Sequence, residues 1–158
     1  MHFVYNMKRN NMEQETISKL CKNTLMEHLG MQFTEVTAGR VVATMPVDHR
    51  TVQPLGRLHG GATMALAESI GSIGSSFLVD TDKYHVLGVE ISGSHVGTTS
   101  ENEVIAVGTI IHQGKTSHVW EIRVQDKNEK LISLCRLSCR IIPAKPHPDP
   151  LQKEREIA

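Results

Sequence analysis

Aromatic residues are scarce in this chain, at 4% of 158 residues, with a single tryptophan. The core must therefore be built mainly from aliphatic side chains and methionine. An excess of charge of one sign is also absent, because 17 lysines and arginines balance 17 aspartates and glutamates. There is no basic run and no alternation of basic and aromatic residues, which disfavours nucleic-acid binding as the main role.

Cysteine is limited to three residues, an odd number that argues against a disulfide framework. Cys135 and Cys139 fall on one expected strand. At ~3.3 Å per residue they are about 13 Å apart, which is too far for a bridge. This cysteine usage predicts a reducing, cytoplasmic compartment. The first residues hold no apolar stretch of the kind found in secretory signals, so we expect no export.

The motifs of several enzyme classes are missing as well. No pair among the nine histidines has His-x-x-x-His spacing, and there is no Cys-x-x-Cys pair. Neither a Gly-x-Ser-x-Gly elbow nor a phosphate-binding P-loop is present. We therefore expect neither a metal nor a cofactor.

The chain does contain one long apolar stretch, 58–79, whose single charged side chain is Glu68. It predicts a helix over 60–79 that is buried because it is apolar or small on all sides. Its central glutamate and Gly-Gly start make it too polar for a membrane span. At 100° per residue its large apolar side chains share one side and its small residues mostly the other. The first set is Leu66, Ile70, Ile73 and Phe77, and the second is Gly61, Met64, Glu68, Ser72 and Ser75.

An ionised carboxylate in such surroundings costs several kcal/mol unless something compensates it. Glu68 is either a rim residue or half of an ion pair, or a functional group. His59, Gly60 and Gly61 precede it at the helix start, where free N–H groups and the helix dipole favour negative charge. The two glycines either form a simple turn or allow a ligand's carbonyl or phosphate to approach. Glu68 lies about 10 Å further along the same side, so a small electrophile could bind between them.

Around this helix the hydrophobic pattern predicts an amphipathic helix over 13–28, ended by Gly30, and six strands. The expected strands span 31–37, 40–47, 86–95, 104–112, 117–125 and 131–142. Two strands, one long helix and four strands joined by hairpins predict an antiparallel sheet with helices on one face, an α+β fold. We expect one domain, 13–142, between a disordered extension over 1–12 and a flexible tail over 143–158.

Five segments together resemble the hotdog-fold acyl-CoA thioesterases. They are Thr44-Met45-Pro46-Val47, Gln53-Pro54, Leu58-His59-Gly60-Gly61, Leu66-Ala67-Glu68-Ser69 and Gly88-Val89-Glu90-Ile91, with His95 following. The closest subgroup in motif is PaaI-like and acts on 1,4-dihydroxy-2-naphthoyl-CoA, of menaquinone biosynthesis, and on hydroxybenzoyl thioesters. The likeness runs from about residue 30 to 142. It implies an antiparallel sheet wrapped around the long helix, assembled as a homodimer and often a homotetramer. The implied activity is hydrolysis of an aromatic or medium-chain acyl-CoA to the free acid and CoA.

The resemblance also implies roles for individual residues. Glu68 would be the catalytic carboxylate, as nucleophile or as base towards water. The Gly60 N–H would polarise the thioester carbonyl with help from the Gln53 amide, and His59, Ser72 and His95 would be further polar groups of the site. The residues assigned to substrate or CoA binding are Gly61, Met64, Val89, Lys115 and Thr116. In this family the site lies between two subunits.

One departure from the family concerns the nucleotide part of CoA. Relatives often place an arginine after His-Val, where this chain has Gly97, and Lys115 could supply the charge instead. Two other functions stay open. The first is a hotdog enoyl-thioester hydratase or dehydratase, which would retain the thiol on its product. The second is an acyl-CoA-binding protein without catalysis.

Overall fold

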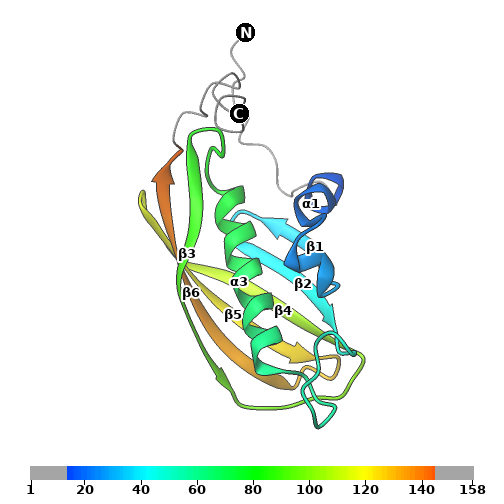
Figure 1. Cartoon of the computed structure of the whole chain (residues 1–158). Helices are drawn as coiled ribbons and strands as arrows, with labels where there is room; N and C mark the ends of the chain where they lie inside the picture. The colour runs from blue at the N-terminus through cyan, green and yellow to red at the C-terminus, as the bar shows by residue number, and fades with distance from the viewer. Residues whose placement is uncertain (1–13, 145–158) are drawn as a thin grey trace, which may run out of the picture.

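The computed structural model describes residues 14–144, so the disorder expected over 1–12 and nearly all of the expected tail lie outside the described residues. Six strands form one antiparallel sheet in the order β1-β2-β4-β5-β6-β3 (Figure 1). Their bounds are β1 Gln32–Thr37, β2 Arg40–Pro46, β3 Tyr84–His95, β4 Glu103–Gln113, β5 Ser117–Asp126 and β6 Leu131–Pro143. These bounds differ from the predicted ones by at most two residues.

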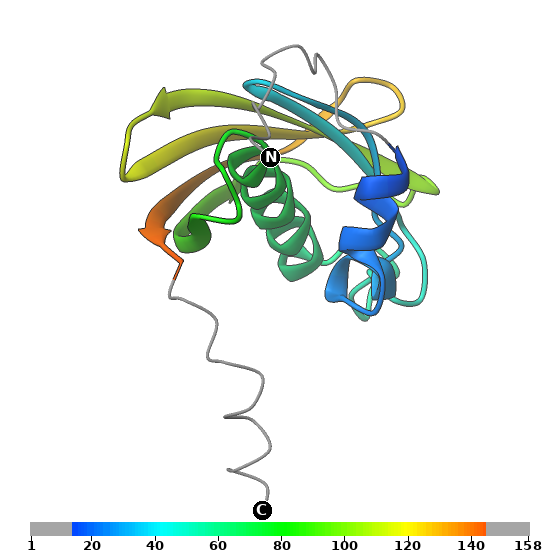
Figure 2. The same ribbon diagram turned by 90° about the horizontal axis from the view of Figure 1, so that it is seen from above.

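The long helix α3, Gly60–Phe77, lies on the concave face of the sheet, which curves around it (Figure 2). After α3 the chain forms β3 at the free edge of the sheet. It then crosses to β4 beside β2, and β5 and β6 fill the sheet from β4 back to β3. This arrangement confirms the predicted α+β fold, an antiparallel sheet wrapped around one long helix.

The single N-terminal helix predicted over 13–28 is wrong, because the chain breaks it into α1, Gln14–Cys21, and α2, Leu25–His28. Asn23 adopts a left-handed conformation with φ of 59°. The Glu27 carboxylate accepts from its N–H at 2.7 Å. Bonds of this kind from a side chain to the backbone compete with a continuous helix. The predicted end at Gly30 is confirmed, with φ of 71°.

Trp120 of β5 forms the centre of the contact between α3 and the sheet. Its ring packs against Gly71 and Gly74, and its Nε1 donates a hydrogen bond to Ser75 Oγ at 2.8 Å. Ser75, placed by periodicity on the side away from the large residues, is instead fully buried. The concave sheet covers a wider arc of the helix than the stripe of large side chains, and small residues let the indole approach.

The other side of α3 faces away from the sheet. Gly61 and Glu68 are exposed there, and Met64 and Ser72 are half-buried. The buried carboxylate expected from the sequence is therefore exposed in the single chain. The sheet shields only one side of the helix. The apolar residues next to Glu68 in the sequence therefore do not surround its carboxylate in space.

We expect Gly74→Ala to lower the free energy of unfolding by about 1–3 kcal/mol, the usual cost of overpacking a core. A Cβ at Gly74 would lie 2.5 Å from Trp120 Cη2 and 2.9 Å from Val41 Cγ2. This clash should exceed the gain of about 1 kcal/mol in helix propensity. Urea unfolding followed by Trp120 fluorescence measures the change. Ser76→Ala is the control on the same helix, and equal stability of the two variants would contradict the close packing.

A buried histidine on β5 makes stability depend on pH. His118 is 2% exposed, and its Nδ1 has no hydrogen-bond partner among residues 14–144. Burial disfavours its charged form and lowers the pKa, and the nearby His112 lowers it further. The unfolded chain therefore takes up a proton near pH ~6.5, whereas the folded chain does so only at lower pH.

Because folding lowers the pKa of His118, we expect the free energy of unfolding to fall as the pH drops below about 6.5. Denaturant titrations at several pH values would measure the slope. His118→Gln should flatten it, because the uptake of this proton is lost. His112→Gln removes only the smaller cause and should keep most of the slope. If wild type and His118→Gln gave parallel curves, His118 would not be the group responsible.

Candidate active site

Within the described residues, the N-terminus of α3 presents backbone N–H groups without a partner, among them that of Gly60. His59 is the N-cap, and its Nδ1 accepts the hydrogen bond of the Gly61 N–H at 2.8 Å. Among the described residues, none accepts from the Gly60 N–H. His59 therefore satisfies one of the free donors of the helix, and Gly60 keeps its donor for a ligand.

His95, the last residue of β3, lies directly beside this donor. A Cβ built on Gly60 would be 2.8 Å from His95 Nε2, so only a glycine lets the imidazole come this close. The other ring nitrogen, Nδ1, is 2.7 Å from the Oγ of Ser133, which is fully buried on β6. Ser133 thereby fixes the orientation of the ring. Ser133 is not among the residues predicted from sequence, because only the register of β3 against β6 pairs it with His95.

Glu68 lies two turns further along α3 and faces the same strand. Its Oε1 is 2.8 Å from the position that a Cβ on Gly88 would take, so the carboxylate rests against the β3 backbone. Cys139 of β6, the register partner of Gly88, is close enough to sense its charge. Strand β3 thus runs beside α3 with Gly88 near Glu68 and His95 near Gly60 (Figure 1).

Cys139 is a structural thiol in this cluster. Burial raises its pKa, and the Glu68 charge raises it further, while hydrogen bonds with Ser75 and Ser72 lower it. The net shift is upward, so the thiol stays protonated at neutral pH and is no candidate nucleophile. Ser72 is thereby placed near Glu68, on the half-buried side of the helix.

Gln53 lies in the loop before α3, which is held in a defined shape. The buried Thr51 donates to the Pro46 carbonyl at 2.7 Å and accepts, through its own carbonyl, from the His59 N–H at 2.8 Å. The side-chain oxygen of Gln53 accepts from the Leu55 N–H. Within residues 14–144 its amide nitrogen has no acceptor, so that N–H₂ group is available to a ligand beside the helix start.

Two of the residues assigned to substrate binding lie along β3. Met64 Sδ is 2.7 Å from the Cβ position of Gly93 and 3.9 Å from Cys135 Sγ, so its thioether packs against the strand between the two ends of the site. Val89 is 59% exposed on the free edge of the sheet.

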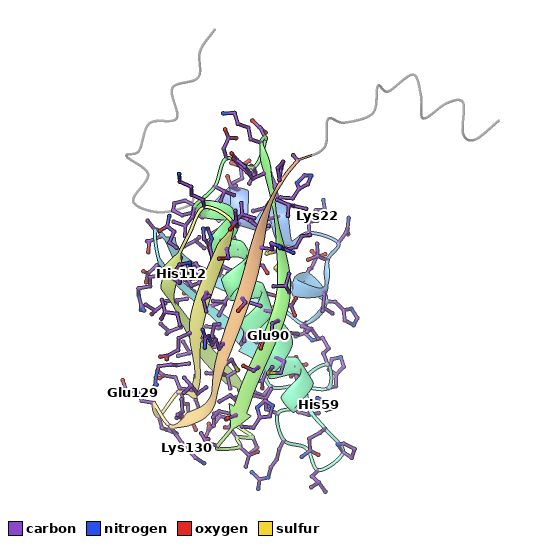
Figure 3. The ribbon with its side chains drawn as sticks, turned by 90° about the vertical axis from the view of Figure 1, so that its left-hand side faces the viewer. Lys22, His59, Glu90, His112, Glu129 and Lys130 are labelled. Atoms are coloured by element: carbon purple, nitrogen blue, oxygen red, sulfur yellow. The ribbon has the colours of Figure 1, made fainter. Side chains whose placement is uncertain are left out.

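Lys115 and Thr116, the other two assigned residues outside the helix, are not brought near His95. They form the turn between β4 and β5, whose flanking pair Gln113 and His118 lies at the sheet end opposite to His95. In Figure 3 His112 lies in the upper half of the view, whereas His59 and Lys130 both lie in the lower part, on opposite sides of the sheet's lower end.

Lys130, which is not among the residues predicted from sequence, places its charge next to Gly97. Its Nζ donates to the Thr98 carbonyl at 3.2 Å. A Cβ on Gly97 would lie 2.6 Å from the Leu131 carbonyl oxygen, so the β5–β6 turn leaves no space for a side chain there. Sequence alone cannot reveal this, because residues 97 and 130 meet only through the pairing of β3 with β6.

The part of the chain from 14 to 144 contains no group of three or more histidine, cysteine, aspartate or glutamate side chains able to hold a metal. No helix in that part is long and apolar enough to cross a membrane. The candidate site offers an exposed carboxylate, an imidazole oriented by a serine, a free backbone N–H and a side-chain amide.

Comparisons with known proteins identify the family and the fold. The model of the Thioesterase superfamily matches residues 55–133. ComA2 of Bacillus subtilis is 45% identical over 121 residues, covering 77% of this chain and 96% of that protein. The proofreading thioesterase EntH of Cronobacter turicensis is 40% identical over 134 residues, covering 85% and 97%. The crystal structure of a mutant of thioesterase PA1618 from Pseudomonas aeruginosa has a TM-score of 0.82 at 38% identity, covering 86% of this chain and 98% of that one. The chain therefore has the hotdog fold and belongs to the thioesterase superfamily.

Proposed function

We propose that this protein hydrolyses an acyl-CoA thioester to the free acid and CoA. The observation that carries the proposal is the free N–H of Gly60 beside His95 at the start of α3, with the Glu68 carboxylate further along the same helix. A thiolate leaves readily, so this reaction needs an activated oxygen nucleophile and a donor for the developing oxyanion more than a strong acid.

In the proposed reaction the thioester carbonyl accepts from the Gly60 N–H, with the Gln53 amide as a second donor. Glu68 either attacks the carbonyl carbon or removes a proton from an attacking water. In the first route a mixed anhydride forms and the C–S bond breaks, and water then releases the acid. In the second route the water oxygen bonds to carbon directly. Both routes end with the acid and the free thiol. His95, beside Gly60, is a further polar group that stabilises the charge on the carbonyl oxygen.

Distance favours a site shared between two copies of the chain. Gly60 and Glu68 are eight residues apart on α3, or about 12 Å along the axis. Attack requires reacting atoms about 3–3.5 Å apart, so both groups of one chain cannot reach the same thioester. Antiparallel pairing of two β3 strands about a centre between Ile91 and Ser92 would place Gly88, and with it Glu68, beside His95 of the second copy.

The edge of the sheet supports this dimer. All twelve residues of β3 lie at a free edge, with Leu87 49% and Val89 59% exposed. A long apolar edge of this kind is unusual in a monomer, because it pairs with other strands. Further association of dimers into a tetramer would use the outer sheet face, where Ile111 is 55% exposed and Leu134 is 36% exposed.

For the substrate, we propose an aromatic acyl group such as 1,4-dihydroxy-2-naphthoyl, or a medium-chain acyl group, as in the PaaI-like subgroup. Met64 and Val89 are the apolar side chains of the site region that would contact it. The proofreading thioesterase EntH, 40% identical, supports thioester hydrolysis as the reaction class. The three free cysteines, Cys21, Cys135 and Cys139, support a reducing, cytoplasmic compartment.

We expect free-thiol release from a panel of naphthoyl-, benzoyl-, phenylacetyl- and straight-chain acyl-CoAs, detected with a thiol reagent. Glu68→Gln keeps the size of the side chain and removes its charge, so the fold should persist while kcat falls by about 10²–10⁴-fold. Glu121→Gln, on an exposed position of β5, is the matched control and should retain full activity.

The outcomes separate the three candidate functions. Hydration of an enoyl-CoA with the thiol retained would favour the hydratase. Tight binding of acyl-CoA without turnover, unchanged by Glu68→Gln, would favour a binding protein. Turnover of Glu68→Gln close to the wild-type rate would contradict the catalytic role of Glu68.

Subunit complementation tests the shared site. Glu68→Gln and His95→Ala should each be inactive as homodimers. The heterodimer of the two, purified through two different tags, should recover about half of the wild-type activity, because one of two symmetric sites is intact. The control is a heterodimer of wild type with the double variant Glu68→Gln/His95→Ala. It should be inactive if each site uses both chains, whereas half activity there would mean that each chain holds a complete site.

A further inference from the structure

At two glycines of β3, Gly88 and Gly93, a Cβ would point towards the side of α3 that carries the candidate site. A Cβ on Gly88 would lie 2.8 Å from Glu68 Oε1, 3.5 Å from its Cδ and 3.7 Å from its Cγ. A Cβ on Gly93 would lie 2.7 Å from Met64 Sδ. The carboxylate oxygen therefore lies in the space that a Cβ at position 88 would occupy, while Cδ and Cγ would be in ordinary van der Waals contact with it.

Backbone conformation does not require glycine at position 88. Gly88 is absent from the positive-φ residues of the described chain, which are Asn23, Gly30, Gly39, Gly56 and Glu129. A glycine inside a strand weakens that strand, because it loses more entropy on folding and offers no side chain for packing. The register of β3 against β6 also shifts between Gly88 and Glu90, and such bulges often lie beside active sites, where they redirect side chains.

We propose that Gly88 is a positioning residue for Glu68, an inference that rests on the proposed function. The missing side chain lets the carboxylate lie flat against the β3 backbone, at the free edge where the second copy is expected. With alanine at position 88 the first atom to move is the end of a flexible side chain, because the three contacts all involve Glu68. The backbone can stay in place while the carboxylate is pushed off the strand.

The expected effect of Gly88→Ala is therefore on kcat and not on folding. A displacement of about 1 Å in a reacting group can lower the rate on the order of 10²-fold. We expect kcat to fall by about 10- to 100-fold with little change in KM. Gly93→Ala is the matched contrast on the same strand and face. It displaces the Met64 thioether and Cys135 Sγ, which would lie 2.7 Å and 2.9 Å from the new Cβ, and leaves Glu68 in place. It should therefore mainly change KM and the preference among acyl groups.

A shorter acid at position 68 distinguishes a positioning role of Gly88 from a purely structural one. Aspartate carries the same charge on one fewer methylene, so it fits beside a Cβ at position 88. The double variant Gly88→Ala/Glu68→Asp should be more active than Gly88→Ala alone. In the background with Gly88, Glu68→Asp should lower kcat less than Gly88→Ala does, because the shorter acid stays against the strand but lies further from the thioester.

The experiment measures kcat and KM of these variants by thiol release from the best acyl-CoA of the panel, with melting temperature and molar mass as checks of folding and assembly. Wild-type kcat in Gly88→Ala, with Glu68→Gln inactive, would overturn this inference and leave the proposed function standing. Full activity of Glu68→Gln would instead overturn the proposed function. Equal loss in Gly88→Ala and in the double variant, with melting temperatures unchanged, would also contradict the positioning role.

Discussion

The indole of Trp120 fills the space left by Gly71 and Gly74 on α3, and its N–H donates to Ser75 at 2.8 Å. This contact fixes the height and the rotation of the helix on the concave sheet. Leu66 and Ile70 are then fully buried, and Glu68 necessarily points away from the core. A larger residue at either glycine would lift the helix and move every group that it carries. The small residues of α3 are thus partly packing residues, and only those on the opposite side remain for function.

The position of β3 at the edge of the sheet gives the site its layout. The strand follows α3, so the helix start, Met64 and Glu68 meet His95, Gly93 and Gly88 in turn. Each close approach depends on a glycine in one partner, at position 60, 93 or 88. The polar groups are held by neighbours with few degrees of freedom: a serine orients His95, and a histidine caps the helix beside the free Gly60 N–H. Such fixed donors stabilise developing charge without reorganising during a reaction.

The proposed dimer would explain why both Glu68 and β3 are exposed in the single chain. A second β3 strand would satisfy the unpaired backbone groups of the edge and cover its apolar side chains. The same pairing would enclose the carboxylate and bring it towards the helix start of the other copy. In a site enclosed in this way electrostatic interactions are stronger than in water, which is what oxyanion stabilisation requires. Assembly and catalysis would then depend on the same strand.

The sequence by itself determined most of the elements and the fold class, and it named the candidate site residues. Hydrophobic periodicity located α3 and all six strands, and the Leu58–Gly61 and Leu66–Ser69 segments pointed to Gly60 and Glu68. Periodicity shows only which residues share a face of a helix. It does not show how wide an arc of α3 the sheet covers, so it puts the buried Ser75 on the side away from the sheet. The local break at Asn23 depended on hydrogen bonds from side chains that periodicity does not register. Only the tertiary structure decided which distant residues meet: Ser133 with His95, Gly88 with Glu68, and Lys130, rather than Lys115, near Gly97. These contacts depend on where β3 lies beside β6 and α3. The paired residues of β3 and β6 are between 38 (His95 and Ser133) and 59 (Tyr84 and Pro143) positions apart, and no local pattern encodes that register.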